Sequence, residues 1–400
     1  MPALARRMAR AGVAATLAMT ARARSMRADG IEVISLAIGE PDFASPPHAV
    51  EAAHQAALRG ETKYPPLDGL PALKQAIQRK FRRDSGLEYA LDEICVANGG
   101  KQILWNAFMA TLDEGDEVVV PAPYWAAYPL MAQVVGGRPV FVTCPQSDGF
   151  KLRPEALDAA ITPRTKWLIL NSPNNPTGAA LSREEIAALG DVLLRHPHVW
   201  VLSDDIYEHL VYDGFRHATL AAVEPRLRER VLTVSGVSKT YAMTGWRVGF
   251  AGGPRELIRA MVNMQGQATS GVSTVGQAAA AAALDGPQDG VAAQVEVYRR
   301  RRDLVVDALN GAPGLSCHRP EGAFYVYPSV AGCLGKITPG GQPLRTDEDV
   351  ALALLQERHV ATVHGAAFGM SPHLRISYAT SDEVLAEACR RIQDFCAGLR

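Results

Sequence analysis

The 400-residue sequence predicts an α/β protein with a mostly parallel, doubly wound sheet in a large domain, followed by a smaller α+β domain. Between about residues 45 and 251, short β-rich runs alternate with segments of helical period, which is typical of a parallel sheet with helices on both faces. After about Asn263 the pattern changes to a long charged helix and then to short strands mixed with helices. Glycine and polar residues cluster after several strands, where open α/β sheets bind their ligands.

The helices of the first part are predicted from their amphipathic period and from end signals. Ser45 and the prolines after it open the first helix, and Gly60 ends it. Ser182 and Glu185 form a capping box at the start of the last one. The helices expected here span 45–60, 70–83, 101–112, 124–135, 154–161 and 182–195. The strands expected between and after them span 93–97, 117–120, 139–143, 166–170, 198–203, 230–235 and 247–251.

The second part begins with the alanine-rich run 277–284, which leads into a long helix over 290–309. Further helices are expected at 348–357 and 381–397, and a surface loop at 332–346. Short strands are expected at 315–318, 323–327, 360–363 and 373–378. We therefore predict an N-terminal arm and part of a small domain over 1–45, a large domain over 46–285, and the small C-terminal domain over 286–400.

Composition excludes several classes of partner and site. The formal net charge is −1, so neither a nucleic acid nor an anionic membrane is an expected partner. The six cysteines are scattered without a Cys-x-x-Cys pair, which argues against a disulfide framework and a zinc site. Cysteine use of this kind fits a reducing compartment, and we expect a cytoplasmic protein without a metal.

The first 28 residues contain arginines but no acidic residue, so a transit or signal peptide is one interpretation. The apolar run 11–19 is alanine-rich and far too short to span a membrane. We favour an amphipathic arm that belongs to the mature protein.

The strongest chemical signal lies in residues 233–249. Lys239 follows a predicted strand among small and apolar neighbours, and Arg247 comes just before the next strand. An amine and a guanidinium are therefore expected at one rim of the sheet. Most lysines after strands are solvated, but poor solvation here would lower the lysine pKa and favour the neutral nucleophile of Schiff-base chemistry.

Three other strand ends carry candidate residues. Gly99 and Gly100 open a helix, where backbone N–H groups and the helix dipole can face a phosphate, although such a pair is also common in tight turns. Asn, Pro and Gly residues crowd positions 171–178, which indicates at least a turn. Asp204 and Asp205 end another strand, and they lack a His or Glu partner at metal-ligand spacing.

Together these motifs resemble the class I and II aminotransferases of fold type I, which bind pyridoxal 5′-phosphate (PLP). The lysine motif matches at Gly236, Ser238, Lys239, Ala242, Gly245, Arg247 and Gly249. The motifs occur in the family's order, from Ile38-Gly-Glu-Pro-Asp-Phe43 to the segment around Arg375, so the resemblance covers nearly the whole chain. It is closest to the bacterial aspartate aminotransferase subgroup.

The resemblance implies a role for each candidate. Lys239 would hold PLP as a Schiff base and move the substrate proton, and Asp204 would pair with the pyridine nitrogen. Asp204 is chosen over Asp205 because it keeps the family's three-residue spacing to Tyr207. The other residues implied at the cofactor are Tyr207 and Asn175 at the ring hydroxyl, Trp125 stacked on the ring, Gly100, Lys101 and Arg247 near the phosphate, and Tyr64 reaching the cofactor of a neighbouring subunit.

One detail of the motifs departs from the family, and a second, the geometry of a peptide bond, can be decided only by a structure. Part of the family has a phosphate-binding serine three residues before the lysine, where this chain has Gly236. Ser235 or Ser238 is a possible substitute. Pro176 is a candidate for a cis peptide bond in the Asn-Pro-Thr-Gly turn.

Substrate contacts are also implied by the resemblance. Arg375 would bind the α-carboxylate and Gly39 would approach it closely, with Trp125 and Asn175 beside the substrate. Lys101 would bind a distal carboxylate. Some members also act on prephenate with the help of a lysine in the N-terminal arm, and Gly12 at that position disfavours prephenate here.

We therefore expect transamination between L-aspartate and 2-oxoglutarate, giving oxaloacetate and L-glutamate by a ping-pong mechanism in a homodimer with shared active sites. Aromatic or prephenate transamination is the nearest alternative, and another PLP enzyme of this fold, such as a lyase, is the next. PLP-sensing transcription regulators share the fold, but they need a basic helix-turn-helix domain for which the arm before Gly39 is too short.

Overall fold

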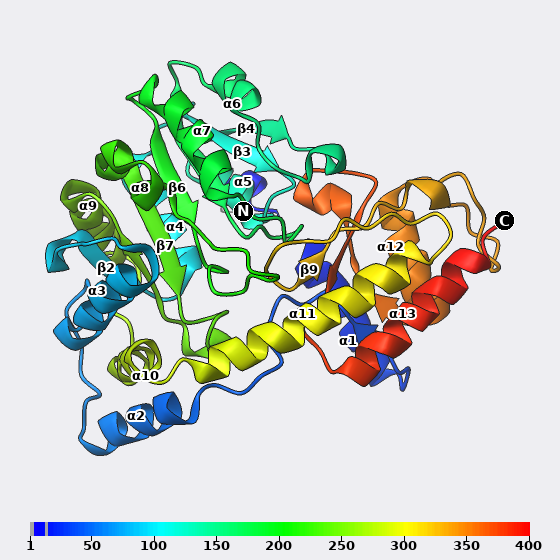
Figure 1. The fold of residues 1–400 in the computed structure, drawn as a ribbon, viewed down its shortest axis with the longest axis horizontal. Coiled ribbons are helices and arrows are strands. Elements are labelled where there is room, and N and C mark those ends of the chain that lie inside the picture. The colour runs from blue at the N-terminus through cyan, green and yellow to red at the C-terminus, as the bar shows by residue number, and fades with distance from the viewer. Residues whose placement is uncertain (1–3, 13–14) are drawn as a thin grey trace.

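The computed structural model describes residues 4–12 and 15–400. Within them a seven-stranded sheet has the order β2-β8-β7-β6-β5-β3-β4 (Figure 1). Its neighbours are parallel from β7 to β4, and β8 is antiparallel to both β7 and β2. The strands are β2 (Ile94–Ala97), β3 (Glu117–Ala122), β4 (Arg138–Thr143), β5 (Thr165–Asn171), β6 (Trp200–Asp204), β7 (Val231–Gly236) and β8 (Gly249–Gly252). The expectation of a mostly parallel sheet is confirmed.

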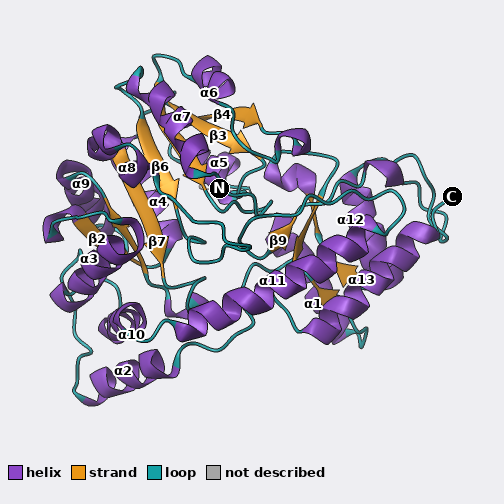
Figure 2. Ribbon diagram, viewed as in Figure 1, coloured by secondary structure: helices purple, strands orange, loops and turns teal. Residues whose placement is uncertain are grey.

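Helices cover both faces of this sheet (Figure 2). The helices of this part of the chain are α2 (Pro47–Leu58), which packs against α10 and not on the sheet, α3 (Pro71–Ser85), α4 (Gly100–Thr111), α5 (Ala127–Val134), α6 (Pro154–Ala160), α7 (Arg183–Leu194), α8 (Leu220–Val223), α9 (Arg255–Gly266) and α10 (Thr274–Asp285). Successive side chains of a strand point to opposite faces. Leu168 and Leu170 of β5 accordingly join one buried cluster, with α3, α7 and α10, while Trp167 and Ile169 join another, with α4, α5 and α9.

A second core lies beside the sheet and combines both ends of the chain. Its helices are α1 (Ala15–Ala28), α11 (Asp289–Asn310), α12 (Asp347–Arg358) and α13 (Asp382–Ala397). Its strands are β1 (Ile34–Ser35), β9 (Tyr325–Val326), β10 (Val360–Ala361), β11 (Val363–His364) and β12 (Leu374–Ser377). β1 pairs with β10 in parallel, and β12 lies between β11 and β9 with antiparallel pairing.

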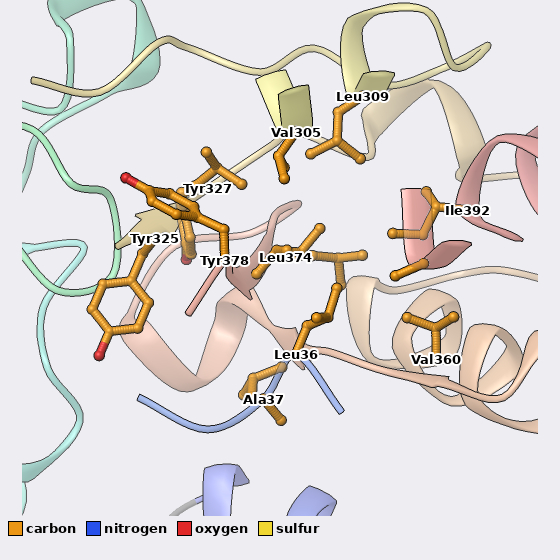
Figure 3. Close-up of a cluster of buried hydrophobic side chains, with 14 of the residues drawn as sticks. Leu36, Ala37, Val305, Leu309, Tyr325, Tyr327, Val360, Leu374, Tyr378 and Ile392 are labelled. Carbon is orange, nitrogen blue, oxygen red and sulfur yellow. The ribbon is translucent and has the colours of Figure 1, made fainter. Parts of the chain in front are cut away.

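The N-terminal segment is therefore part of this second core. Leu36 and Ala37 lie in the same apolar cluster as Val360 and Leu374 (Figure 3). Helix α11 runs from beside α10 to the helices α12 and α13 (Figure 1). The domain boundaries at 45 and 285 stay a prediction.

Several expected elements differ in the structure. Residues 315–318 form only an isolated bridge, between Ser316 and Ser329, and not a strand. The expected strand 360–363 is divided between β10 and β11, which belong to different sheets. Helix α9 was not predicted, and α5 begins at Ala127 instead of residue 124. The short strands depend on long-range pairing, which local patterns do not contain. Long-range contacts also hold the segment before α5, where the Tyr124 N–H donates to the Phe368 carbonyl oxygen at 3.0 Å.

No described helix combines the length and the apolar character needed to cross a bilayer.

Candidate active site

The candidate residues gather where three neighbouring parallel strands end. Asn171 at the end of β5 is in register with Asp204 at the end of β6, and Asp204 is in register with Val234 of β7. Lys239 follows β7 by three residues. The loops after these strands therefore share one edge of the sheet, as expected from the sequence.

Lys239 lies at the centre of this edge. Its Nζ donates to the Gly39 carbonyl oxygen at 2.6 Å, and it lies 5.9 Å from the centroid of the Phe324 ring. Burial lowers the pKa of Lys239 to about 8, and the guanidinium groups of Arg375 and Arg247 act in the same direction, against the Glu40 carboxylate. A neutral amine is therefore accessible near physiological pH, as a nucleophile or a base requires.

Asp204 is a buried carboxylate held by two donors. The Tyr128 hydroxyl donates to its Oδ2 at 2.7 Å, and the Ile206 N–H to its Oδ1 at 3.3 Å. Burial raises the pKa of Asp204 to about 6, and these two hydrogen bonds act to lower it. Asp204 is therefore largely ionised at neutral pH although it is only 5% exposed.

Two observations on this strand end concern residues outside the predicted set. Tyr128 was not predicted: it lies on α5, one helical turn after Trp125, and its ring packs edge-on against that of Trp125 at 5.3 Å. A tyrosine in an amphipathic helix is usually interpreted as a core residue. Only its spacing of one helical turn from Trp125 could have indicated from the sequence that Tyr128 belongs to the site. Asp205 is bound elsewhere, because it accepts from Ser203 at 2.8 Å and faces His217.

Arg375 is a buried guanidinium, and its hydrogen-bond partners among the described residues include no carboxylate. It donates to Asn175 Oδ1 at 3.2 Å and to the Ala37 carbonyl oxygen at 2.5 Å. Its Nε has no described acceptor, and the Tyr325 and Phe368 rings flank it, each with its centroid 4.9 Å away. Burial lowers its pKa from the ordinary value. A buried cation with a free donor is suited to binding a carboxylate.

Tyr325, which was not predicted, lies between Arg375 and two predicted residues, Tyr207 and Gly39. The Tyr207 and Tyr325 hydroxyl oxygens are 2.9 Å apart. Figure 3 shows the Tyr325 hydroxyl pointing away from the apolar cluster. A Cβ atom at Gly39 would collide with that hydroxyl, which explains why a glycine stands there.

A second positive region lies at the start of α4. Arg247 donates to the carbonyl oxygens of Thr244 at 2.8 Å and Asn98 at 3.2 Å, which brings it against Gly99. Gly99 has a φ of +87°, and a Cβ atom there would collide with the Arg247 guanidinium. No side chain caps the helix, which starts at Gly100. Uncapped N–H groups beside a guanidinium form an anion site.

Lys101 extends this positive region toward Trp125. Its Nζ lies 5.0 Å from the centroid of the Trp125 ring. Burial lowers the pKa of Lys101, and the charge of Arg247 acts in the same direction. Lys101 and Trp125 are thus neighbours, as their predicted roles require.

The structure also bears on the open details of the motifs. Ser235 donates to Glu208 Oε1 at 2.6 Å, so its hydroxyl is already engaged, whereas Ser238 is buried next to Lys239. The expectation of a cis bond before Pro176 is wrong. The cis bond of this turn is Ser172–Pro173, directly after β5, where the chain leaves the sheet.

Tyr64 is not brought to the site by its own chain. It lies in the loop between α2 and α3, and its side chain is 96% exposed.

Comparisons with known proteins agree with this geometry. A sequence profile of the family described as aminotransferase class I and II matches residues 31–392. The chain is similar to an aspartate/prephenate aminotransferase of Cereibacter sphaeroides, with 57% identity over 98% of both chains. It is also similar to an aspartate aminotransferase of Rhizobium meliloti, with 56% identity over 98% of this chain and 96% of the relative.

Solved structures extend the comparison to the fold. The crystal structure of the Rhizobium meliloti aspartate aminotransferase matches with a TM-score of 0.98 and 55% identity over the whole of both chains. The Thermus thermophilus aspartate aminotransferase with maleate matches with a TM-score of 0.91 and 42% identity, over 99% of this chain and 100% of that one. By sequence and by fold, this chain belongs to the class I and II aminotransferase family.

Proposed function

We propose that this aminotransferase uses PLP to transfer the amino group of L-aspartate to 2-oxoglutarate, giving oxaloacetate and L-glutamate. The observation that carries the proposal is the buried Arg375, which has no carboxylate partner among the described residues and lies near the Lys239 amine, with a second cation, Lys101, at the start of α4. Two cationic groups suit a substrate with two carboxylates. The names of the relatives from Rhizobium meliloti and Thermus thermophilus support aspartate as that substrate.

The residues present fit PLP. The phosphate would be held by Arg247 and the uncapped start of α4, with Ser238 as the remaining serine candidate. Asp204 is ionised and would hold a proton on the pyridine nitrogen, while Asn175 and Tyr207 would donate to the ring hydroxyl. Trp125 would cover one face of the ring. When bound, PLP supplies an aldehyde that captures amino groups and a ring that withdraws electrons from Cα.

Lys239 would first anchor the cofactor and then, once released, carry the proton between Cα and the cofactor as a general base and acid. Its lowered pKa of about 8 suits both roles, because neither protonation state is rare near neutral pH. Arg375 and Gly39 would hold the α-carboxylate, and Lys101 the distal carboxylate. A dicarboxylate is named with the Thermus thermophilus relative, whose structure contains maleate.

Prephenate is a second candidate substrate, because the Cereibacter sphaeroides relative is described as an aspartate/prephenate aminotransferase. Gly12, in place of the lysine implied by the family resemblance, stands against it.

We also propose a homodimer in which Tyr64 reaches the partner's cofactor. The exposure of Tyr64, away from the proposed site of its own chain, supports this arrangement.

The deciding experiment is an absorbance titration of the PLP-loaded protein with L-aspartate and then with 2-oxoglutarate. Aspartate should convert the cofactor to its amine form, and 2-oxoglutarate should restore the original spectrum. A protein that responds to phenylalanine or prephenate but not to aspartate would contradict the role of Lys101. A spectrum that no amino acid changes would contradict the proposed function itself.

A further inference from the structure

A buried ion pair lies behind the proposed site. Lys80 of α3 is only 2% exposed, and its Nζ is 2.5 Å from Oε2 of Glu208, which is also buried. Burial acts to raise the pKa of the Glu208 carboxyl, but the Lys80 ammonium, with the His209 and His217 side chains nearby, outweighs it and keeps that pKa below its ordinary value. Lysine and glutamate are rarely this buried, and such pairs often stabilise a fold no better than apolar residues do.

The position of Glu208 connects two segments of the site. Glu208 directly follows Tyr207, so it belongs to the turn that carries Asp204 and Tyr207. Its other oxygen, Oε1, accepts from Ser235 at 2.6 Å. Ser235 is the penultimate residue of β7, four residues before Lys239. One carboxylate therefore joins the turn after β6 to the strand that leads into Lys239.

Neighbouring charges reinforce the connection. His209 Nε2 lies 3.1 Å from Oδ2 of Asp84, which is on α3 one turn after Lys80. Asp84, Glu208 and His209 have the mutual spacing of metal ligands. The Lys80 ammonium, however, lies 2.5 Å from Glu208 and 3.7 Å from Asp84, so it supplies the positive charge of this cluster. Helix α3 thus contacts the two residues that follow Tyr207: Lys80 contacts Glu208, and Asp84 contacts His209.

We propose that Glu208, paired with Lys80, is a positioning residue of the active site. Through Ser235 it sets the separation between the Asp204–Tyr207 turn and the strand end that presents Lys239. The inference rests on the proposed cofactor site. It also assigns the Ser235 hydroxyl to this contact and not to the cofactor phosphate.

The test compares this network with a matched one at the opposite ends of the strands. There Thr162 donates to Glu117 Oε2 at 2.7 Å, and Glu117 is a fully buried carboxylate at the first residue of β3. The variants are Ser235→Ala and Glu208→Gln, with Thr162→Ala and Glu117→Gln as controls. For each we would measure the dissociation constant of PLP, the rate constant of a single turnover with aspartate, the absorbance of the bound cofactor against pH, and thermal unfolding.

A positioning role predicts that Ser235→Ala and Glu208→Gln weaken PLP binding and slow the single turnover roughly 10- to 100-fold, since small displacements of reacting groups have effects of this size. The pH midpoint of the cofactor absorbance should move in both. Thr162→Ala and Glu117→Gln should lower the unfolding temperature and leave the other three quantities unchanged.

Other outcomes would overturn the inference. If Ser235→Ala and Glu208→Gln lose thermal stability but keep wild-type cofactor binding, turnover and absorbance, the network is purely structural. Equal losses of binding and turnover in the control variants would have the same meaning. If Glu208→Gln does not fold, the measurements on Ser235→Ala alone test the inference, because that variant leaves the Lys80–Glu208 ion pair in place. A wild-type protein that binds no PLP would instead overturn the proposed cofactor site, and this inference with it.

Discussion

At the scale of single residues, the amine of Lys239 should titrate within the range of pH in which the protein can be assayed. Its amine is neutral above its pKa, which burial lowers to about 8, compared with about 10.4 for an exposed lysine. The rate at which the apoprotein captures PLP should therefore rise with pH, with a midpoint near 8, and level off above it. Stopped-flow absorbance after mixing apoprotein with PLP measures this rate. A midpoint near 10 would show that the amine is solvated.

Tyr128 acts on Asp204 through one hydrogen bond, and its removal has a predictable sign. In Tyr128→Phe the carboxylate loses a donor, so its pKa should rise above about 6 and more of it should be protonated at pH 6.5. A hydrogen bond to a charged group contributes about 1.5 kcal/mol, which is about one pKa unit, so the ionised fraction of Asp204 and the affinity for PLP should both fall roughly fourfold at that pH. The loss should shrink at pH 8.5, where the carboxylate ionises again.

The control for that experiment is Tyr124→Phe. The Tyr124 ring stacks on Phe141 with centroids 5.1 Å apart, so losing its hydroxyl should leave PLP binding unchanged. Equilibrium binding at the two pH values separates the variants. An equal loss at both pH values in Tyr128→Phe would mean that the hydroxyl does not act through the ionisation of Asp204.

Lys101 determines substrate preference in the proposed function. Lys101→Gln removes a charged donor for the distal carboxylate, and kcat/KM for aspartate should fall roughly 10- to 100-fold, as for other hydrogen bonds to charged groups. Phenylalanine, which lacks a second carboxylate, serves as the control within the same protein, and its kcat/KM should change little. A parallel fall for both amino acids would place Lys101 at the cofactor only.

At the scale of elements, α7 illustrates how local sequence sets a boundary. The Ser182 hydroxyl accepts from the Glu185 N–H at 3.2 Å, and Glu185 Oε2 accepts from the Ser182 N–H at 2.7 Å. Ser182→Ala should therefore destabilise the protein by about 0.5–2 kcal/mol, as removal of a helix cap usually does. Denaturant unfolding measures the change. The KM for aspartate should not move, because neither residue belongs to the proposed site.

The same scale separates what local pattern predicts from what it misses. Helices α2, α3, α4, α6 and α7 and all seven strands of the large sheet were expected from period and end signals. Apart from the twelve-residue helix α9, the errors fall on short segments. Residues 360–363, with the sequence Val-Ala-Thr-Val, were expected to form one strand, but Val360 pairs with Ile34 and Val363 with Arg375. Pairing partners that distant are not encoded in a local run.

At the scale of the whole molecule, the proposed homodimer should appear as twice the chain mass by light scattering. Sharing of sites is tested by hybrids of a Lys239→Ala chain with a Tyr64→Ala chain. The Lys239→Ala chain still offers Tyr64, so one site in the hybrid should regain wild-type PLP affinity that the Tyr64→Ala homodimer lacks. Hybrids without that high-affinity site would contradict the exchange of Tyr64 between subunits.

The α/β class, the family and the predicted site residues Lys239, Asp204, Asn175 and Arg247 could all be predicted from the order of residues alone. This was possible because hydrophobic period is a local property, and because parallel strands bring the residues that follow them to one edge of the sheet. The roles of these residues stay predictions.

The contacts between side chains that are far apart in the sequence became visible only in the folded chain. Tyr128 and Asp204 are 76 residues apart, and Lys80 and Glu208 are 128 apart. In the sequence, Tyr128 and Lys80 look like ordinary residues of amphipathic helices. They acquire a function only because packing against the sheet buries them beside a carboxylate, where an unpaired charge would be strongly unfavourable.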